Sequence, residues 1–303
     1  MSIRDRIYLR LWRGRNSLRR FKRIAVRPWK YRHTPPAEMV HFSCNICGHR
    51  NSLPRYEMGR ESGACIFCGA SVRWRSIIYA LSMEIFGQNL SLDNFPVRKD
   101  IRGVGLSDWL GYAIPLAKKF DYKNTFYHRQ PLLDIGHPDP AEFGQYNFLI
   151  STDVFEHVPP PVASAFAGAS KLLKPGGVMI FSVPCVAGLT QEHFPELHRF
   201  TVEKKGDTWI LINETADGRR QEFEDLNFHG GPGTTLEMRV FGEQSLRAHC
   251  EEAQFERIRT YSNEVPESGI LWIDYDPLTA PYHPPILGLD APPWAAHRSL
   301  DKN

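Results

Sequence analysis

Apolar and polar positions follow a regular pattern between residues 147 and 184, and this stretch organises the rest of the chain. Residues 148–150 and 178–181 are short apolar runs rich in β-branched or aromatic side chains, which is typical of buried strands in a parallel sheet. Between the runs, apolar residues recur at helical spacing: Val162, Ala165, Phe166, Ala169, Leu172 and Leu173. The pattern therefore predicts a strand–helix–strand unit.

The two ends of the predicted helix differ in character. Pro175, Gly176 and Gly177 follow it, and these residues end a helix and let the chain turn back into a sheet. Residues 151–158, STDVFEHV, come before it and place polar and acidic groups at the carboxyl end of the first strand. Ligands of open α/β sheets bind at that edge. The sequence therefore predicts a ligand site beside residues 151–158.

The motif DVFEHV, followed by a helix, LLKPGG and an apolar strand, resembles the second half of class I S-adenosylmethionine-dependent methyltransferases of the type 11 group. The resemblance implies an α/β fold with a doubly wound, mostly parallel sheet, and S-adenosylmethionine as cofactor. It also implies that Asp153 belongs to the cofactor site. The alternative is a strand–helix–strand unit of another doubly wound protein, because such folds recur without shared function.

The same resemblance assigns six residues to the cofactor site: Gly103, Gly105, Ser107, Asp108, Asp134 and Asp153. Residues 100–108 occupy the place of the family's glycine-rich loop, where glycines let the backbone approach the ligand. This chain departs from the family pattern, since Ser107 takes the third glycine position and Asp108 stands in for an acid expected before Gly103. Asp134 matches the acid near the adenine amino group, and a turn-forming aspartate is the alternative.

Four of the six cysteines form two C-x2-C pairs, Cys44 with Cys47 and Cys65 with Cys68. Seventeen residues separate the pairs, which is within the spacing of four-cysteine zinc sites. Four thiolates leave no open coordination position, so the pattern predicts a structural Zn²⁺ site in a small zinc ribbon. Four free buried cysteines are the alternative. The pattern also favours a reducing, cytoplasmic compartment over a disulfide framework.

Residues 1–33 carry most of the positive charge. They contain ten arginines and two lysines against Asp5, a net charge of +11, and since the whole chain has +3 the remainder carries −8. Ile3, Ile7 and Leu11 recur among these cations at helical spacing. A basic amphipathic helix is expected to lie on an anionic membrane surface, with an RNA-contacting arm or a solvated tail as alternatives. We therefore expect a cytoplasmic protein with peripheral membrane contact.

The chain divides into four predicted regions: the basic segment 1–36, the zinc ribbon 37–72, the methyltransferase domain 73–275 and a Pro-rich tail 276–303. A helix is predicted to start at Val72, with Arg73 and Arg75 as a solvated helix start. The domain is predicted to close with a helix at 243–253 and strands near 255–261 and 270–273.

An insertion at residues 185–235 interrupts the predicted domain. It is longer than loops usually are, so we expect it to form a lid over the substrate. Within it, residues 209–213 and 220–223 are apolar or alternating and are joined through Asp217 and Gly218, which predicts a β-hairpin.

Three histidines are the candidate catalytic residues: His157 at the strand edge, and His193 and His229 in the insertion. Methyl transfer needs alignment of donor and acceptor, and a hydroxyl acceptor also needs a base. The alternative for His193 and His229 is a solvated surface histidine.

The predicted function is methylation, with O-methylation favoured, of a small-molecule or glycan-type acceptor. An RNA methyltransferase is one alternative, although the net negative charge beyond residue 33 counts against it. A zinc-containing scaffold that has lost catalysis is the other. The departures from the family's cofactor residues support that scaffold, among them His128 where an acid is usual.

Overall fold

The structure is a computed structural model that describes residues 17–26, 29–272 and 292–300. So far as these ranges reach, the chain forms two compact units. Among the described residues, the first comprises 17–26, 29–99, 109–122 and 261–272, and the second comprises 100–108, 123–260 and 292–300. The predicted helix positions Ile3, Ile7 and Leu11 lie outside the described residues. Among the described residues, no helix has the length and apolarity needed to cross a bilayer.

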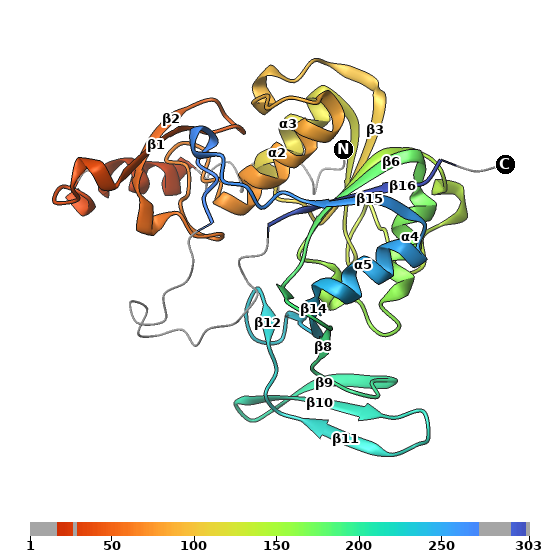
Figure 1. Ribbon diagram of the computed structural model, residues 1–303. Helices are drawn as coiled ribbons and strands as arrows, with labels where there is room; N and C mark the ends of the chain where they lie inside the picture. The colour runs from red at the N-terminus through yellow and green to blue at the C-terminus, as the bar shows by residue number, and fades with distance from the viewer. Residues whose placement is uncertain (1–16, 27–28, 273–291, 301–303) are drawn as a thin grey trace. The chain divides into compact units, whose positions relative to one another are not determined.

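A six-stranded mixed sheet is the framework of the second unit (Figure 1). Its strands, in spatial order, are β15 (Phe255–Thr260), β16 (Trp294–Arg298), β6 (Leu173–Ser182), β5 (Tyr146–Thr152), β3 (Arg98–Leu106) and β4 (Phe120–Thr125). The pairs β3–β5 and β5–β6 are parallel, whereas β16 is antiparallel to both of its neighbours. The parallel strands β3, β5 and β6 therefore end at the same edge of the sheet.

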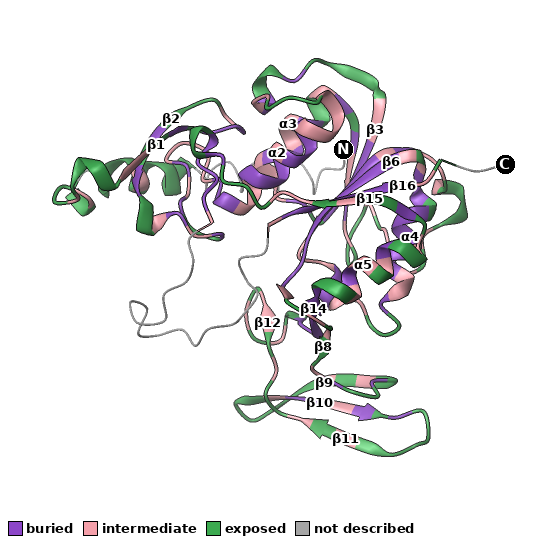
Figure 2. Ribbon diagram, viewed as in Figure 1, coloured by how far each residue is buried: buried purple, intermediate pink, exposed green. Residues whose placement is uncertain are grey.

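Helices α4 (Ala163–Leu172) and α5 (Glu243–Glu252) pack together and against this sheet. The apolar residues that recur along α4 are buried in one core with β5 and β6: Ala165, Phe166, Ala169 and Leu172. Figure 2 shows buried residues along β6 and β16. The predicted strand–helix–strand unit of residues 147–184 is confirmed by β5, α4 and β6, and the predicted helix at 243–253 by α5.

The structure differs from the sequence prediction near the C-terminus. Residues 276–303 were expected to form an extended tail, but β16 lies between β6 and β15. Trp294 pairs with Phe181, and Ala295 with Ile180, so burial of apolar side chains explains this strand. A strand was expected at residues 270–273. In the described part of that range Ile270 makes only an isolated bridge with Val265, and β16 joins the sheet instead. Residues 276–291 of the predicted tail lie outside the described residues.

Eight short strands follow β6 over residues 185–242; this segment includes the predicted insertion 185–235, is called the insertion below and is seen in the lower part of Figure 1. They are β7 (Cys185–Val186), β8 (Gln191–Glu192), β9 (Arg199–Lys205), β10 (Thr208–Glu214), β11 (Arg220–Phe223), β12 (Phe228–His229), β13 (Thr235–Leu236) and β14 (Arg239–Gly242). Strands β9, β10 and β11 form an antiparallel sheet, which confirms the predicted hairpin, and β12 pairs with β13. A small core that includes Phe194, Leu211 and Met238 stabilises the insertion.

The first unit contains the cysteine pairs and two long helices. Its elements are β1 (Met39–Ser43), β2 (Arg50–Pro54), α2 (Val72–Phe86) and α3 (Leu110–Lys119), with a helix at residues 17–26 and the 3-10 turns η1 (Pro36–Glu38), η2 (Arg55–Glu57), η3 (Leu92–Asn94) and η6 (Pro266–Ser268). Strands β1 and β2 form an antiparallel hairpin. The helix predicted to start at Val72 is confirmed by α2.

Arg75 is not the solvated residue that the sequence predicted. It is fully buried, and its Nη1 donates to the carbonyl oxygens of Gly63 at 2.9 Å and Ala70 at 2.5 Å. Its Nη2 donates to Gly269 O at 2.6 Å, and the guanidinium lies over the Phe42 ring. The carbonyl groups of the loops around α2 are not paired in a β-sheet. The buried guanidinium of Arg75 supplies hydrogen-bond donors to them.

Candidate functional site

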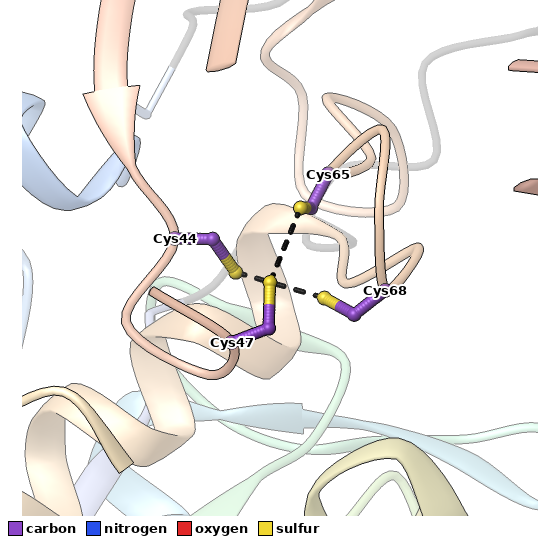
Figure 3. Close-up of side chains that lie close together, drawn as sticks. All are labelled: Cys44, Cys47, Cys65 and Cys68. Atoms are coloured by element: carbon purple, nitrogen blue, oxygen red, sulfur yellow. Dashed lines mark hydrogen bonds between the residues drawn. The ribbon is translucent and has the colours of Figure 1, made fainter. Parts of the chain in front are cut away.

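Two clusters of side chains in the described part of the chain have the residue types of a metal or catalytic site, and the first is formed by the four paired cysteines (Figure 3). The sulfur atoms of Cys44 and Cys68 lie 3.7 Å apart, as do those of Cys47 and Cys65, and all four lie within 4.8 Å of one another. A tetrahedral ion with bonds of about 2.3 Å to sulfur requires sulfur–sulfur distances of roughly 3.8 Å. The cysteine cluster therefore has the donor set and spacing of a closed Zn²⁺ site.

Each cysteine pair sits on the same kind of backbone turn. The N–H of Gly48 donates to Cys44 O at 2.8 Å, and the N–H of Gly69 donates to Cys65 O at 2.9 Å. Both glycines have positive φ, +70° and +84°, which favours glycine over residues with a Cβ. The glycine after each pair thus lets two thiols point toward one centre.

The basic helix at residues 17–26 contributes to the surroundings of the cysteine cluster. Arg23 Nε donates to Ile66 O at 3.2 Å, between the two cysteines of the second pair. Burial lowers the pKa of Arg23, while the neighbouring Cys68 and Cys65 oppose that shift. Asn51 Nδ2 donates to Cys65 Sγ at 3.3 Å. Asn51 thus donates directly to a sulfur atom of the cluster, and Arg23 places a positive charge beside it.

The predicted cofactor residues Ser107 and Asp153 follow β3 and β5, so both lie at the carboxyl edge of the parallel strands. Both have positive φ, 58° and 51°, where the chain turns out of the sheet. Asp153 is held by Ser182 at the end of β6, because the Asp153 N–H donates to Ser182 O at 2.9 Å and Ser182 Oγ donates to Asp153 Oδ1 at 2.9 Å. The end of β6 therefore fixes the orientation of this carboxylate.

Asp108 and Asn124 hold the loop after β3 in place. The Asp108 N–H donates to Asn124 Oδ1, and Asn124 Nδ2 donates back to Asp108 O, both at 2.9 Å. The Ser107 N–H donates to Thr125 O at 2.7 Å. Asp108 is buried, so the loop is rigid where the resemblance implies cofactor contact.

The two glycines of β3 serve the sheet. A Cβ added at Gly103 would lie 2.1 Å from the Phe148 ring, so this position must lack a side chain for β3 and β5 to pack. Gly105 is buried in the same strand, and its carbonyl oxygen accepts a hydrogen bond from Thr125 Oγ1 at 2.8 Å. The role of both glycines at the cofactor stays a prediction.

Ser151 is a residue that the sequence analysis did not single out as a cofactor contact. It pairs with Leu106 in the parallel register, next to the loop after β3. Its Oγ is buried and makes no hydrogen bond among the described residues. Because a buried hydroxyl is usually hydrogen-bonded, this one is available to a polar ligand at the strand edge. The strand edge therefore fits a polar cofactor.

Asp134 lies in the loop between β4 and β5. Its Oδ1 accepts a hydrogen bond from the Gly136 N–H at 2.9 Å, and its Oδ2 lies 3.5 Å from His137 Nδ1. These contacts are those of a turn-forming aspartate. A role near the adenine stays a prediction.

The second cluster, called the His–Glu cluster below, contains all three predicted catalytic histidines and two glutamates. Its members are Glu156 and His157 from the 3-10 turn η5 (Phe155–His157), and His193, His229 and Glu237 from the insertion. Glu156 Oε1 lies 3.6 Å from His157 Nε2 and 3.6 Å from His229 Nδ1. The two imidazole rings are 4.6 Å apart, edge to face. The structure thus brings together histidines that the sequence predicted separately.

Hydrogen bonds fix the far side of each ring in the His–Glu cluster. His157 Nδ1 lies 2.7 Å from Leu236 O, and since a carbonyl only accepts, this nitrogen carries the proton. Glu237 accepts from His229 Nε2 at 2.8 Å and from His193 Nε2 at 2.9 Å. In its neutral form each of His157 and His229 therefore turns a bare nitrogen toward Glu156.

Burial and charge set the protonation of this cluster. Burial lowers the pKa of His157 to about 4, so its ring is neutral at neutral pH. Burial acts to raise the pKa of Glu237, but the hydrogen bonds from His193 and His229 outweigh it and hold that pKa at about 2. Glu237 is therefore an anion that orients two imidazoles.

Arg239 holds the turn that carries Glu156 and His157. The residue is fully buried, and its Nη1 donates to Phe155 O at 3.2 Å and Val158 O at 2.6 Å. Its Nε donates to Glu192 Oε1 at 2.8 Å. The sequence analysis did not identify Arg239 or Glu237, although both are charged residues between the apolar positions of residues 236–241.

Comparison with known proteins gives one clear match. The family model described as a methyltransferase domain matches residues 93–260, whereas no curated protein matches the sequence. A 1,6-didemethyltoxoflavin N1-methyltransferase of Burkholderia thailandensis, solved with S-adenosylhomocysteine, has 12% identity and a TM-score of 0.38 over 74% of this chain and 78% of its own. The sugar N-methyltransferase KedS8 of Streptoalloteichus sp has 10% identity and a TM-score of 0.40, over 77% and 88%. Likeness at this level does not bear on substrate.

Proposed function

The chain belongs to the methyltransferase-domain family, and from this premise we propose that it methylates a hydroxyl group of a small-molecule or glycan-type acceptor. The enzyme is an S-adenosylmethionine-dependent methyltransferase. One observation carries the proposal for the acceptor. His157, in the turn after β5, and His229, from β12, both present bare nitrogens toward Glu156, where they can accept the proton of an acceptor hydroxyl.

We assign cofactor binding to the strand edge formed by Ser107, Asp108, Ser151 and Asp153. When bound, S-adenosylmethionine supplies a methyl group that its sulfonium charge has already activated. The buried Ser151 hydroxyl and the Asp153 carboxylate are positioned for its polar groups, and Asp134 is assigned to the adenine end. Gly103 and Gly105 lie in β3, where the lack of a side chain at Gly103 lets β3 pack closely against β5.

The His–Glu cluster receives the proton of the acceptor hydroxyl. As the oxygen–methyl bond forms and the sulfur–methyl bond breaks, the proton passes to His157 Nε2 or His229 Nδ1. Glu237 stabilises the imidazolium that forms on His229, and His193 orients Glu237. The insertion carries three of these five residues, which supports its assignment as a substrate lid.

Two measurements test this function. Calorimetric titration with S-adenosylmethionine is expected to give micromolar binding, and Ser151→Ala is expected to weaken it by about 0.5–1.5 kcal/mol, the net value of one hydrogen bond. With hydroxylated and aminated sugars as acceptors, mass spectrometry is expected to find methyl transfer to hydroxyl groups. His229→Ala should reduce transfer by about 100-fold without changing cofactor affinity, because His229 acts on the acceptor proton and not on the cofactor.

The matched control is His198→Ala, since His198 is an exposed histidine of the same insertion and lies outside the His–Glu cluster. It is expected to leave transfer unchanged. Absence of S-adenosylmethionine binding would contradict the proposal and favour a scaffold that has lost catalysis. Transfer to amines alone would refute the O-methylation.

We also propose that the cysteine cluster is a zinc ribbon that binds one structural Zn²⁺. The sulfur separations and the repeated glycine turns support this assignment. Metal analysis of protein purified without chelator is expected to find one zinc per chain. A substoichiometric zinc content in folded protein would refute the assignment.

Residues 1–33 are proposed to contact anionic membranes. In the described part of this segment, Leu18 and Phe21 are exposed on the helix at residues 17–26, next to Arg19, Arg20 and Lys22. Exposed apolar side chains flanked by cations suit a charged lipid surface. Co-sedimentation with anionic vesicles is expected, and it should be lost on deletion of residues 1–33. Equal partitioning of both chains would contradict this proposal.

A further inference from the structure

Two imidazole nitrogens in the His–Glu cluster face a single carboxylate oxygen. His157 Nε2 and His229 Nδ1 each lie 3.6 Å from Glu156 Oε1, which is beyond hydrogen-bond distance. One ligand atom from each of the three residues lies within 4.8 Å of the other two. Atoms that bind one metal ion at about 2.0–2.2 Å are roughly 3.0–3.5 Å apart. The two carboxyl–imidazole separations of 3.6 Å are close to that range, and the separation of the two nitrogens is under 4.8 Å.

The outer contacts of both rings are those of metal-binding histidines. A histidine ligand donates its other N–H to a carbonyl or carboxylate, which fixes the tautomer and the ring orientation. Here the His157 Nδ1–H donates to Leu236 O at 2.7 Å, and the His229 Nε2–H donates to Glu237 Oε2 at 2.8 Å. His193 in turn holds Glu237. Both rings are thereby fixed with their lone pairs toward Glu156.

We propose that Glu156, His157 and His229 bind a divalent transition-metal ion. Two imidazoles and one carboxylate form a donor set suited to Mn²⁺, Fe²⁺ or Zn²⁺. Three protein ligands leave coordination positions open, unlike the four thiolates of the cysteine cluster. The open positions accept oxygen atoms of the acceptor, and this part of the inference rests on the proposed methyltransferase function. With the ion bound, His157 Nε2 and His229 Nδ1 are ligands rather than bases, and the ion takes over their role. A hydroxyl bound at an open position is polarised and loses its proton to solvent on the His229 side.

Solvent exposure increases from the glutamate to the second histidine of the three proposed ligands. The side chain of Glu156 is 0% exposed, that of His157 is 12% exposed and that of His229 is 36% exposed. The anionic ligand is therefore deep in the protein, where its attraction for a cation is least screened. Solvent and small ligands reach the cluster on the His229 side.

The backbone around the ligands is rigid. Arg239 binds the carbonyl oxygens of Phe155 and Val158 on either side of the Glu156–His157 pair, and the Met238 N–H donates to Glu156 O at 2.9 Å. These bonds connect the turn after β5 to the strand that follows His229. Ligands from both segments are thereby held together before an ion binds.

The test is a titration of the full-length, zinc-loaded protein with MnCl₂, in which free Mn²⁺ is measured by electron paramagnetic resonance. Mn²⁺ is chosen because thiolates prefer softer ions, so the cysteine cluster does not compete for it. One Mn²⁺ is expected to bind per chain. His229→Ala, at a half-exposed position that leaves the fold intact, should weaken binding at least 10-fold, and Glu156→Gln, which keeps the side-chain shape, should do the same.

His198→Ala is the matched control and should bind Mn²⁺ as the unchanged protein does. The proposal is overturned if no Mn²⁺ binds, or if it binds equally well to His229→Ala and Glu156→Gln proteins that have normal circular dichroism. Failure of the two proposals is distinguishable. S-adenosylmethionine binding and methyl transfer without Mn²⁺ binding remove the metal site alone, whereas Mn²⁺ binding without cofactor binding removes the methyltransferase proposal alone.

Discussion

The cysteine cluster and the His–Glu cluster differ in where their residues come from and in how they are closed. All four cysteines lie within residues 44–68, on two turns that repeat the same backbone geometry. The His–Glu cluster joins the turn after β5 to an insertion that reaches Glu237. Four thiolates complete a coordination shell, whereas Glu156, His157 and His229 leave positions open. A local, closed cluster stabilises a fold, and an open one assembled from distant segments is available for chemistry.

Each cluster depends on one fully buried arginine. Arg75 donates to the carbonyl oxygens of Gly63 and Ala70, which flank the second cysteine pair. Arg239 donates to the carbonyl oxygens that flank Glu156 and His157. Loops that supply ligands have carbonyl groups without ladder partners, and a guanidinium satisfies several of them from one point. A buried guanidinium thus lies beside both the proposed structural centre and the proposed reactive one.

The largest effect is expected from Cys65→Ser, because it opens the closed cluster. In small metal domains the free energy of zinc binding is folding free energy, on the order of 10 kcal/mol. We expect loss of bound zinc and unfolding of the cysteine-containing segment, measured by metal analysis and urea denaturation. Cys185→Ser is the control, since Cys185 is a half-buried cysteine outside the cluster and its loss should change stability by less than about 1 kcal/mol. Equal stability of both variants would show that the cysteine cluster is not structural.

The sequence predicted most of the fold because its signals are local. The apolar spacing in residues 147–184 predicted β5, α4 and β6, and the cysteine spacing predicted a four-sulfur cluster. It failed at β16, where the apolar run is short and preceded by prolines, and its partner β6 is distant in the sequence. The sequence around Trp294 contains no signal that this segment pairs with β6 on one side and β15 on the other.

Prediction of the candidate site was partial for a similar reason. His157, His193 and His229 were selected one at a time, but their convergence depends on the pairing of β12 with β13 and on contacts of the insertion with the turn after β5. Arg75 and Arg239 were misjudged or missed because burial of a charged residue depends on carbonyl groups from other loops. Charge patterns along the chain do not show such partners.

The second largest effect is expected from removal of either buried arginine. Arg75→Met removes the donor from the carbonyl oxygens of Gly63 and Gly269. Arg239→Met removes it from that of Val158 and takes away the partner of Glu192. At about 1–3 kcal/mol per group, each variant should destabilise the protein by about 2 kcal/mol or more. Arg75→Met should lower zinc retention and spare Mn²⁺ binding, whereas Arg239→Met should do the reverse. Urea denaturation and metal analysis measure both effects.

Arg220→Met is the control for both arginines, because Arg220 is exposed and pairs with Glu222 within the insertion. Its stability should stay within about 0.5 kcal/mol of the unchanged protein. If either buried arginine affected both metals equally, the assignment of one arginine to each cluster would be wrong.

A smaller effect is expected from Glu237→Gln, which removes the charge that orients His229 but keeps a hydrogen-bond acceptor. Outer-shell partners of metal-binding histidines contribute about 10–100-fold to affinity or activity. We expect Mn²⁺ affinity and methyl transfer to fall by that factor, with the fold unchanged by circular dichroism. Glu224→Gln removes an exposed carboxylate of the same insertion and should have no effect. A Glu237→Gln enzyme with full activity would show that the cluster acts without its outer carboxylate.

The smallest effect is expected from His193, which contacts Glu237 and reaches the three proposed ligands only through it. His193→Ala removes one of the two hydrogen bonds that hold Glu237, so Mn²⁺ affinity should fall by less than in Glu237→Gln, by about 3- to 10-fold for one net hydrogen bond. His193→Gln retains a side-chain N–H donor and should recover part of the loss, which a general packing defect would not. If instead His193→Ala abolished transfer while sparing Mn²⁺ binding, His193 would be the base, and the acceptor would bind on the His193 side of the cluster.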